Sequence, residues 1–212
     1  MRTISLEGWP RKEHYLFFQK FDYPYFSLCA DMDISKMLPL IKERKISFTA
    51  VMMYLIARAA NGIPEFRQRA REGEPVEYPV VHPSSTILSK DDLFTFCTVR
   101  YDPEFNEFIR KAEEEIALVK EQPGLAEKIQ DDSMLFMSSI PWVSFTSFQH
   151  PLKLNPADSV PRFAWGKYRQ DDEAVLLPLS VQGHHALMDG LHAGLFYQDF
   201  QKLLNQPGSF IS

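Results

Sequence analysis

The stretch His184-His185-Ala186-Leu187-Met188-Asp189-Gly190 joins a strand-like run to a helix-like run near the end of the sequence. Residues 174–185 predict a strand, and residues 189–205 predict a helix that Asp189 can cap. A histidine at a strand end, followed four residues later by a helix-capping aspartate, suits a general base in a fixed position. The search for a fold and a site therefore starts at this junction.

The two neighbouring histidines cannot share one environment, because successive side chains of a strand point to opposite faces. His185 lies on the face that carries the apolar residues Val175, Leu177, Leu179 and Val181 together with Gly183. We expect His185 in a site shielded from water, beside space that Gly183 leaves, where desolvation favours the neutral imidazole. His184 lies on the more polar face and is expected to be a hydrogen-bonded structural residue.

Other interpretations of the motif HHxxxDG stay open at this point. His185 can be a core histidine with its hydrogen bonds satisfied, and Asp189 can be a helix cap and nothing more. A metal site that uses His184, His185, Asp189 and His192 is less favoured, since strand geometry separates the first two ligands.

The remaining sequence predicts one α/β domain over residues 1–212, with helices packed on a mixed β-sheet. Expected helices cover residues 10–20, 34–44, 47–61, 103–122 and 189–205. Strands are expected at 26–33, within 76–101, and at 134–148, 163–168 and 174–185, with polar loops at 121–133 and 149–161.

Composition excludes several classes of protein. The net charge of −5 argues against a nucleic-acid binder, which usually carries a basic surplus. Cys29 and Cys97 stand alone, so neither a disulfide framework nor a zinc site is expected. The first residues lack an apolar signal core, and the apolar run at 48–57 is too short to span a membrane. These features predict a reduced, cytoplasmic protein.

Three motifs occur in an order that resembles the chloramphenicol acetyltransferases. They are the stretches Trp9-Pro10-Arg11-Lys12-Glu13-His14, Ser138 to Phe148, and Leu177 to Gly190. The similarity covers nearly the whole chain. It implies a two-layer sandwich of helices on a mixed sheet, the fold of CoA-dependent acyltransferases. It also implies acetyl-CoA as a cosubstrate, no tightly bound cofactor or metal, and a homotrimer with active sites at its interfaces.

The resemblance also assigns catalytic roles. His185 is the expected general base, and Ser138 is expected to donate a hydrogen bond to the oxyanion. Asp189 and Arg11 are expected to pair and hold the surroundings of the histidine. Without the resemblance, Ser138 is better explained as a sheet serine bonded to a neighbouring backbone group. Arg11 and Asp189 can then be an ion pair of purely structural value.

The residues expected to contact coenzyme A follow the family pattern more closely than those expected to line the pocket for the hydroxyl-bearing acceptor. Trp142 and Tyr168 are expected to contact coenzyme A, with Lys167 nearby. Aromatic walls for the acceptor are expected from Phe18, Phe26, and either Phe94 or Phe96. The chain departs from the family pattern at Asp22, Pro24, Arg162 and Ala164. Asp22 and Arg162 are expected to pair with each other or with a polar acceptor, or to point to solvent.

The sequence thus favours transfer of the acetyl group from acetyl-CoA to a hydroxyl of chloramphenicol or a similar amphipathic alcohol. An acyltransferase core that acts on dihydrolipoamide also carries HxxxDG, but the lipoyl and linker segments expected before such a core are not seen. A non-catalytic binder of a hydrophobic ligand is the third possibility, which the presence of His185, Ser138 and Asp189 disfavours.

Overall fold

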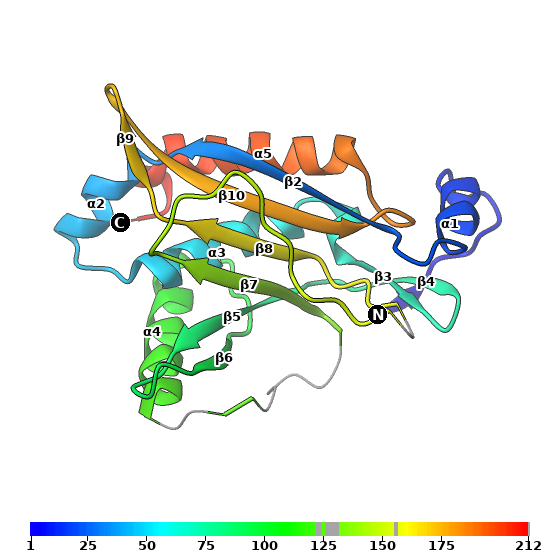
Figure 1. Cartoon of the computed structure of the whole chain (residues 1–212), viewed down its shortest axis with the longest axis horizontal. Helices are drawn as coiled ribbons and strands as arrows, with labels where there is room; N and C mark the ends of the chain where they lie inside the picture. Colours follow the sequence, from blue (N-terminus) through cyan, green and yellow to red (C-terminus); the bar gives the residue numbers. More distant parts are fainter. Residues whose placement is uncertain (122–123, 126–131, 155–156, 212) are drawn as a thin grey trace.

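A seven-stranded mixed sheet forms the centre of the molecule, whose computed structural model describes residues 1–121, 124–125, 132–154 and 157–211 (Figure 1). The strand order is β2-β10-β8-β7-β5-β6, with β9 paired to β10. Strand β7 runs parallel to both β5 and β8, and the other pairs are antiparallel. The strands are β2 (Tyr25–Asp33), β5 (His82–Leu88), β6 (Phe94–Thr98), β7 (Met134–Ile140), β8 (Arg162–Gly166), β9 (Arg169–Asp171) and β10 (Ala174–His184).

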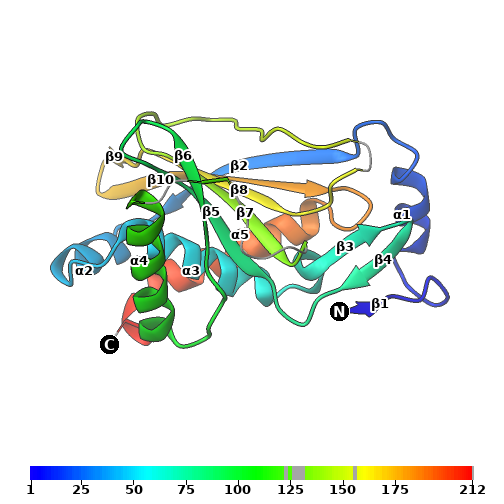
Figure 2. The same ribbon diagram turned by 90° about the horizontal axis from the view of Figure 1, so that it is seen from below.

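Helices cover one face of this sheet, and the chain between β7 and β8 crosses the other face (Figure 2). Helices α3 (Phe48–Asn61), α4 (Phe105–Glu121) and α5 (Gly190–Asn205) form the helical layer. Helix α3 is buried almost all round, as its continuous apolar sequence predicts, and its N-terminus is capped by the Ser47 side chain. This arrangement confirms the predicted two-layer α/β fold.

The smaller elements lie around this frame. Helix α2 (Met37–Glu43) follows β2, and helix α1 (Lys12–Phe18) stands beside the end of the sheet where β10 finishes (Figure 1). A second sheet has the order β1-β4-β3, formed by Arg2–Thr3, Glu74–Glu77 and Gln68–Arg71. Strands of two to four residues carry too little periodicity to be found by pattern. Single 3-10 turns occur at Pro64–Arg67 and Pro207–Ser209.

The predicted strand over residues 134–148 is wrong in its second half, because β7 ends at Ile140. Pro141 has no backbone N–H to donate to a ladder, and the chain leaves the sheet there to run across its face. Helix α1 is also shorter than predicted and ends at Phe18. The predicted polar loop at 121–133 falls largely outside the described residues.

The alternation predicted for β10 is confirmed. Leu177, Leu179 and Val181 point into the core against the helices. Ser180, Gln182 and His184 therefore face the opposite side, under the chain that crosses the sheet. None of the helices in the described part of the chain is long and apolar enough to cross a membrane.

Candidate active site

His185 follows the last residue of β10 and lies between α1 and β2. Its backbone N–H donates to the Pro24 carbonyl at 2.7 Å, which fixes the chain at the turn. The ring stacks on Phe18 with centroids 4.1 Å apart and also lies near the ring of Phe26. Nδ1 is buried and has no hydrogen-bond partner among the described residues, which leaves Nε2 as the nitrogen that can meet a substrate.

His184 occupies a different environment, as the alternation of strand side chains predicts. It is 3% exposed and packs edge-on against the ring of Tyr25. Its Nδ1 accepts a hydrogen bond from the backbone N–H of Ala186 at 3.3 Å. Burial lowers the pKa of His184 to about 4, so it stays neutral at physiological pH. The prediction that His184 is a hydrogen-bonded structural residue is confirmed.

Arg11 holds the backbone on the far side of His185. Its guanidinium donates to the carbonyl oxygens of His185 at 3.1 Å and Ala186 at 3.2 Å, and lies 2.7 Å from the Asp189 carboxylate. Burial alone would raise the pKa of Asp189, but the hydrogen bond and charge of Arg11 bring it below its usual value. The predicted contact between Arg11 and Asp189 is therefore present. Arg11 also fixes the turn that carries His185, through its hydrogen bonds to the carbonyl oxygens of His185 and Ala186.

Asp189 is also the N-cap of α5. Its Oδ1 accepts from the backbone N–H of Leu191 at 3.0 Å, while Nδ1 of His192 accepts from the N–H of Asp189. The opposite ring nitrogen of His192 lies 3.5 Å from the carboxylate of Glu65. The contact between His192 and Glu65 was not anticipated, because their elements meet only in the folded chain.

The sequence predicted that Gly183 leaves space beside His185, and this prediction is wrong. A Cβ at position 183 would lie 2.3 Å from Sδ of Met188 and 3.3 Å from the Phe26 ring. The space that the glycine leaves is therefore filled by Met188. This sulfur-containing side chain has a packing function that the motif alone did not reveal.

Ser138 lies on the opposite side of the sheet from the helices, at the floor of a cavity of about 660 Å³. Phe94 and Phe96 both line this cavity, so the choice between them is resolved in favour of both. Other lining residues come from β5, β7, the start of β8 and the chain that crosses the sheet: Ser84, Thr86, Leu88, Phe136, Ile140, Trp142, Phe148, His150, Asp158 and Arg162. The cavity is thus aromatic at its walls and polar at one end.

The four departures from the family pattern occupy different places. Arg162 is buried in the cavity wall and is paired with Asp158, so it does not pair with Asp22. Asp22 is exposed and does not line the cavity. Ala164 is buried beneath the cavity, in register with Ser138. Pro24 does not line the cavity, and its carbonyl holds the N–H of His185.

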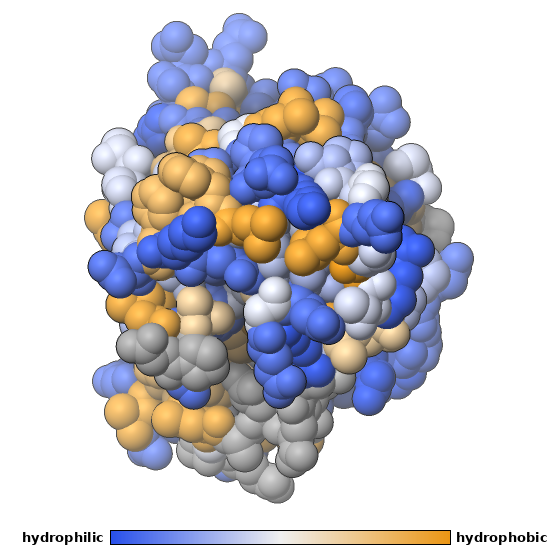
Figure 3. Space-filling model, turned by 90° about the vertical axis from the view of Figure 1, so that its right-hand side faces the viewer, coloured by the Kyte–Doolittle hydropathy of each residue, from blue (hydrophilic) through white to orange (hydrophobic). Residues whose placement is uncertain are grey.

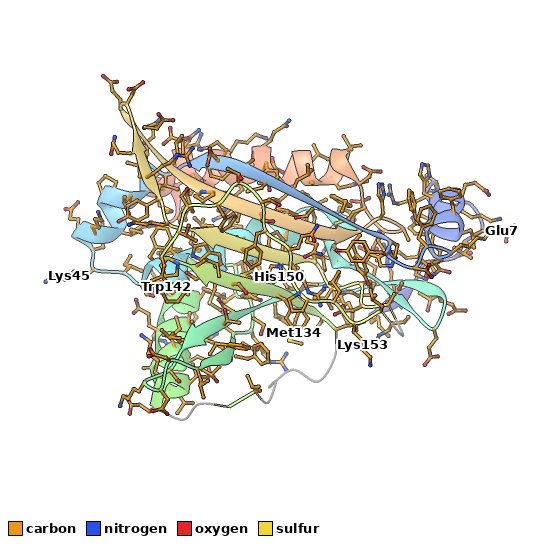
Figure 4. The ribbon with its side chains drawn as sticks, in the orientation of Figure 1. Glu7, Lys45, Met134, Trp142, His150 and Lys153 are labelled. Carbon is orange, nitrogen blue, oxygen red and sulfur yellow. The ribbon has the colours of Figure 1, made fainter. Side chains whose placement is uncertain are left out.

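Of the residues expected to contact coenzyme A, Trp142 lines the cavity, and Lys167 and Tyr168 lie outside its lining. Trp142 is 67% exposed at the cavity rim (Figure 4). The N–H of Lys167 donates to the carbonyl of Val143, which ties the two segments together. Tyr168 is partly exposed and lies near Phe48 and Nζ of Lys42. Phe48 and Lys42 were not predicted, since they come from remote helices and match no motif.

Within one chain, His185 and Ser138 do not meet. Ser138 is in register with Ala164, and Ala164 with Ser180, so Ser138 lies two strands from β10 and roughly 10 Å across the sheet. His185 follows Ser180 by five residues, which adds about 16 Å along the strand. Consistent with this separation, His185 is not among the residues that line the cavity around Ser138. The candidate base and the candidate oxyanion donor are thus about 20 Å apart.

Comparison with known proteins agrees with the three motifs. The chloramphenicol acetyltransferase family model matches residues 1–201. Chloramphenicol acetyltransferases of Klebsiella sp, Escherichia coli and Bacillus pumilus are 31%, 32% and 32% identical, over 96–97% of this chain and 94% of each relative. A solved chloramphenicol acetyltransferase superposes with a TM-score of 0.88 at 26% identity, over 96% of this chain and all of the other.

More distant structures share the fold alone. The dihydrolipoamide acetyltransferase of Azotobacter vinelandii superposes with a TM-score of 0.70 at 14% identity, over 94% of this chain and 88% of that protein. Its similarity carries no statement about substrates. The match of the family model, the identity to the three relatives and the agreement in fold lead to one conclusion: the chain belongs to the chloramphenicol acetyltransferase family.

Proposed function

We propose that residues 1–212 act as one acetyltransferase domain, which moves the acetyl group of acetyl-CoA to a hydroxyl of chloramphenicol or a similar amphipathic alcohol. The observation that carries this proposal is His185, whose Nδ1 is buried and whose ring is held between Phe18 and Phe26. The curated relatives of the chain are named as chloramphenicol acetyltransferases.

The chemistry proceeds by direct attack with both substrates bound. Nε2 of His185 removes the proton of the acceptor hydroxyl as its oxygen attacks the thioester carbonyl, a contribution of roughly 10²–10⁴-fold in rate. The carbonyl oxygen becomes an oxyanion, to which the Ser138 hydroxyl donates a hydrogen bond. Collapse of this intermediate breaks the carbon–sulfur bond, and the coenzyme A thiolate takes the proton from the imidazolium. No acyl-enzyme forms.

The separation of His185 from Ser138 supports an active site shared between two copies of the chain. We propose a homotrimer, in which His185 of one copy meets the cavity and Ser138 of the next. Apolar side chains around α1, beside His185, are exposed in the single chain: Leu16, Phe17, Phe21 and Tyr23. Figure 3 shows hydrophobic surface on this side of the molecule, interrupted by polar groups. Such a surface suits contact with another copy.

Coenzyme A is proposed to lie across Trp142 and Tyr168, near Lys167, at the end of the cavity where β7 finishes. The exposed aromatic surface and the neighbouring cationic side chains suit the adenine ring and the phosphates. Cys29 and Cys97 are not joined in a disulfide, which agrees with a reducing compartment. We therefore place the enzyme in the cytoplasm, where acetyl-CoA is available.

A thiol-release assay with acetyl-CoA and chloramphenicol tests the proposal. The wild-type chain is expected to release coenzyme A only when the acceptor is present, and His185→Ala is expected to lose nearly all of this activity. His14→Ala, which changes an exposed histidine of α1, is the matched control and should keep wild-type turnover. Ordinary turnover in a folded His185→Ala variant would exclude His185 as the base.

A further inference from the structure

The cavity around Ser138 has a polar end that the reaction itself does not require. Arg162 and Asp158 form a buried ion pair there, four residues apart, with Arg162 also donating to the Val160 carbonyl at 2.8 Å. The guanidinium lies 5.2 Å from the ring centroid of Phe136. A buried charge pair in an otherwise aromatic cavity costs desolvation free energy. Its presence in the wall of a binding cavity points to a role in recognition.

The position of the pair relative to Ser138 follows from strand register. Phe136 is in register with Arg162, and Ser138 follows it by two residues on the same face of β7. That spacing places the polar end about 7 Å from Ser138. Trp142 follows Ser138 by four residues and comes just after the end of β7, in the other direction along the strand. Figure 4 shows Trp142, His150 and Lys153 in this order across the molecule. Ser138 is thus between the proposed coenzyme A end and the polar end.

Asp158 is the member of the pair that a ligand can reach. Its side chain is 22% exposed, whereas that of Arg162 is only 8% exposed. The carboxylate is held in place by Arg162 and by the backbone N–H of Val160, which donates to Oδ1 at 2.8 Å. Its remaining lone pairs can accept a hydrogen bond from a ligand. The group that fits here is therefore a hydrogen-bond donor.

The hydrogen-bond donor group of the ligand that fits beside Asp158 is uncharged. The charge of Asp158 is balanced by Arg162, so neither a cation nor an anion finds an uncompensated partner. His150 lies against Phe148 beside the pair, and burial together with the charge of Arg162 lowers its pKa to about 4. It therefore adds no charge at neutral pH. The exposed Lys153 and Asp92 at the cavity rim are of opposite sign.

We propose that Asp158, oriented by Arg162, binds a second hydroxyl of the acceptor, so that the enzyme selects amphipathic diols over simple aromatic alcohols. This inference rests on the proposed acetyltransferase function and adds a specificity-determining pair to it. The aromatic walls hold the apolar body of the acceptor, Ser138 lies at its reacting end, and Asp158 receives its second hydroxyl.

Three acceptors that differ at one group test this inference. They are hydrocinnamyl alcohol, the same alcohol with a hydroxyl on its benzylic carbon, and the methyl ether of that benzylic hydroxyl. In a thiol-release assay with acetyl-CoA, we expect kcat/KM for the diol to be about tenfold higher than for the other two. A second reactive hydroxyl by itself accounts for only about a twofold gain, and the ether can accept but not donate. Equal values for the diol and the ether would overturn the inference.

A paired variant assigns the preference to these two residues. Asp158→Ala with Arg162→Leu removes both charges together and leaves no unpaired ion, so the diol preference should fall to about twofold, while hydrocinnamyl alcohol is still acetylated. The control is Glu114→Gln with Arg110→Leu, an exposed pair of the same spacing on α4, which should keep the preference. A preference that persists in the Asp158 and Arg162 variant would contradict the proposal.

The inference and the proposed function can fail separately. Absence of thiol release with every acceptor, chloramphenicol included, would refute the acetyltransferase proposal. Titration calorimetry of the diol and its methyl ether with the wild-type chain, in the presence of coenzyme A, then decides the inference. Diol binding about tenfold tighter than ether binding supports the subsite, and equal affinities overturn it. The same comparison decides the matter if the double variant does not fold.

Discussion

Arg11 shows how one side chain can position the proposed base, His185, without touching its imidazole ring. Its guanidinium bonds the carbonyls of His185 and Ala186 and the carboxylate of Asp189, three acceptors grouped around one turn. The planar fork of arginine suits such a set of acceptors, and a lysine would serve them one at a time. The imidazole itself is then held by rings, Phe18 on one face and Phe26 at an angle.

The role of Ser138 is tested by its removal. If its hydroxyl stabilises the oxyanion, Ser138→Ala should lower kcat by about 10²–10³-fold, because the lost hydrogen bond forms only as charge develops in the transition state. The KM for acetyl-CoA should change little, which steady-state kinetics with both substrates will measure. An unchanged kcat would make Ser138 a structural residue of β7.

The pKa values of two buried histidines, His184 and His150, predict how the stability of the fold depends on pH. Burial lowers the pKa of His184 and of His150 to about 4, whereas histidine in an unfolded chain titrates near 6.5. Between these values the unfolded chain binds more protons than the folded one, so stability is complete above about pH 6.5 and is lost as pH falls toward 4. The loss is up to about 3 kcal/mol for His184. Urea unfolding at a series of pH values should show a shallower decline for His184→Gln than for the wild-type chain.

At the level of elements, helices and long strands were predictable, and the contacts between them were not. Helix α3 is buried on nearly all sides, which requires a continuous apolar sequence. Strand β10 has one face in the core, which requires apolar residues at alternate positions. Both patterns can be recognised in the sequence. The end of β7 was missed because residues 141–148 look strand-like while Pro141 turns the chain out of the sheet. Asp158 escaped notice as the partner of Arg162 because no motif marks the loop that carries it.

The junction between β10 and α5 depends on the packing of Gly183 against Met188. A Cβ at Gly183 would overlap Sδ of Met188, so Gly183→Ala should destabilise the fold by about 1–3 kcal/mol. Met188→Ala alone should cost about 2–5 kcal/mol, because it truncates a buried side chain. In the double variant the combined loss should be smaller than the sum of the two single losses, since the overlapping side chain is removed. Thermal and denaturant unfolding of the wild-type chain, the two single variants and the double variant will measure this coupling. Purely additive effects of the two substitutions would contradict the packing described here.

At the scale of the whole molecule, the sequence identified His185 and Ser138 as partners, but only the fold shows how they are separated. Strand register places them about 20 Å apart, at different ends of the sheet. In the proposed shared site, one chain holds both halves without completing it. The exposed apolar side chains beside His185 give a second copy a surface to cover.

Complementation between two inactive variants tests this shared site most directly. His185→Ala and Ser138→Ala are co-expressed with different tags, and hetero-oligomers that carry both tags are purified and assayed for thiol release. In a cyclic trimer that contains both variants, one interface in three pairs an intact His185 from one copy with an intact Ser138 from the next. We predict that activity returns to about a third of the wild-type value per site. Hetero-oligomers no more active than the two parent variants would show that the catalytic groups do not meet across an interface.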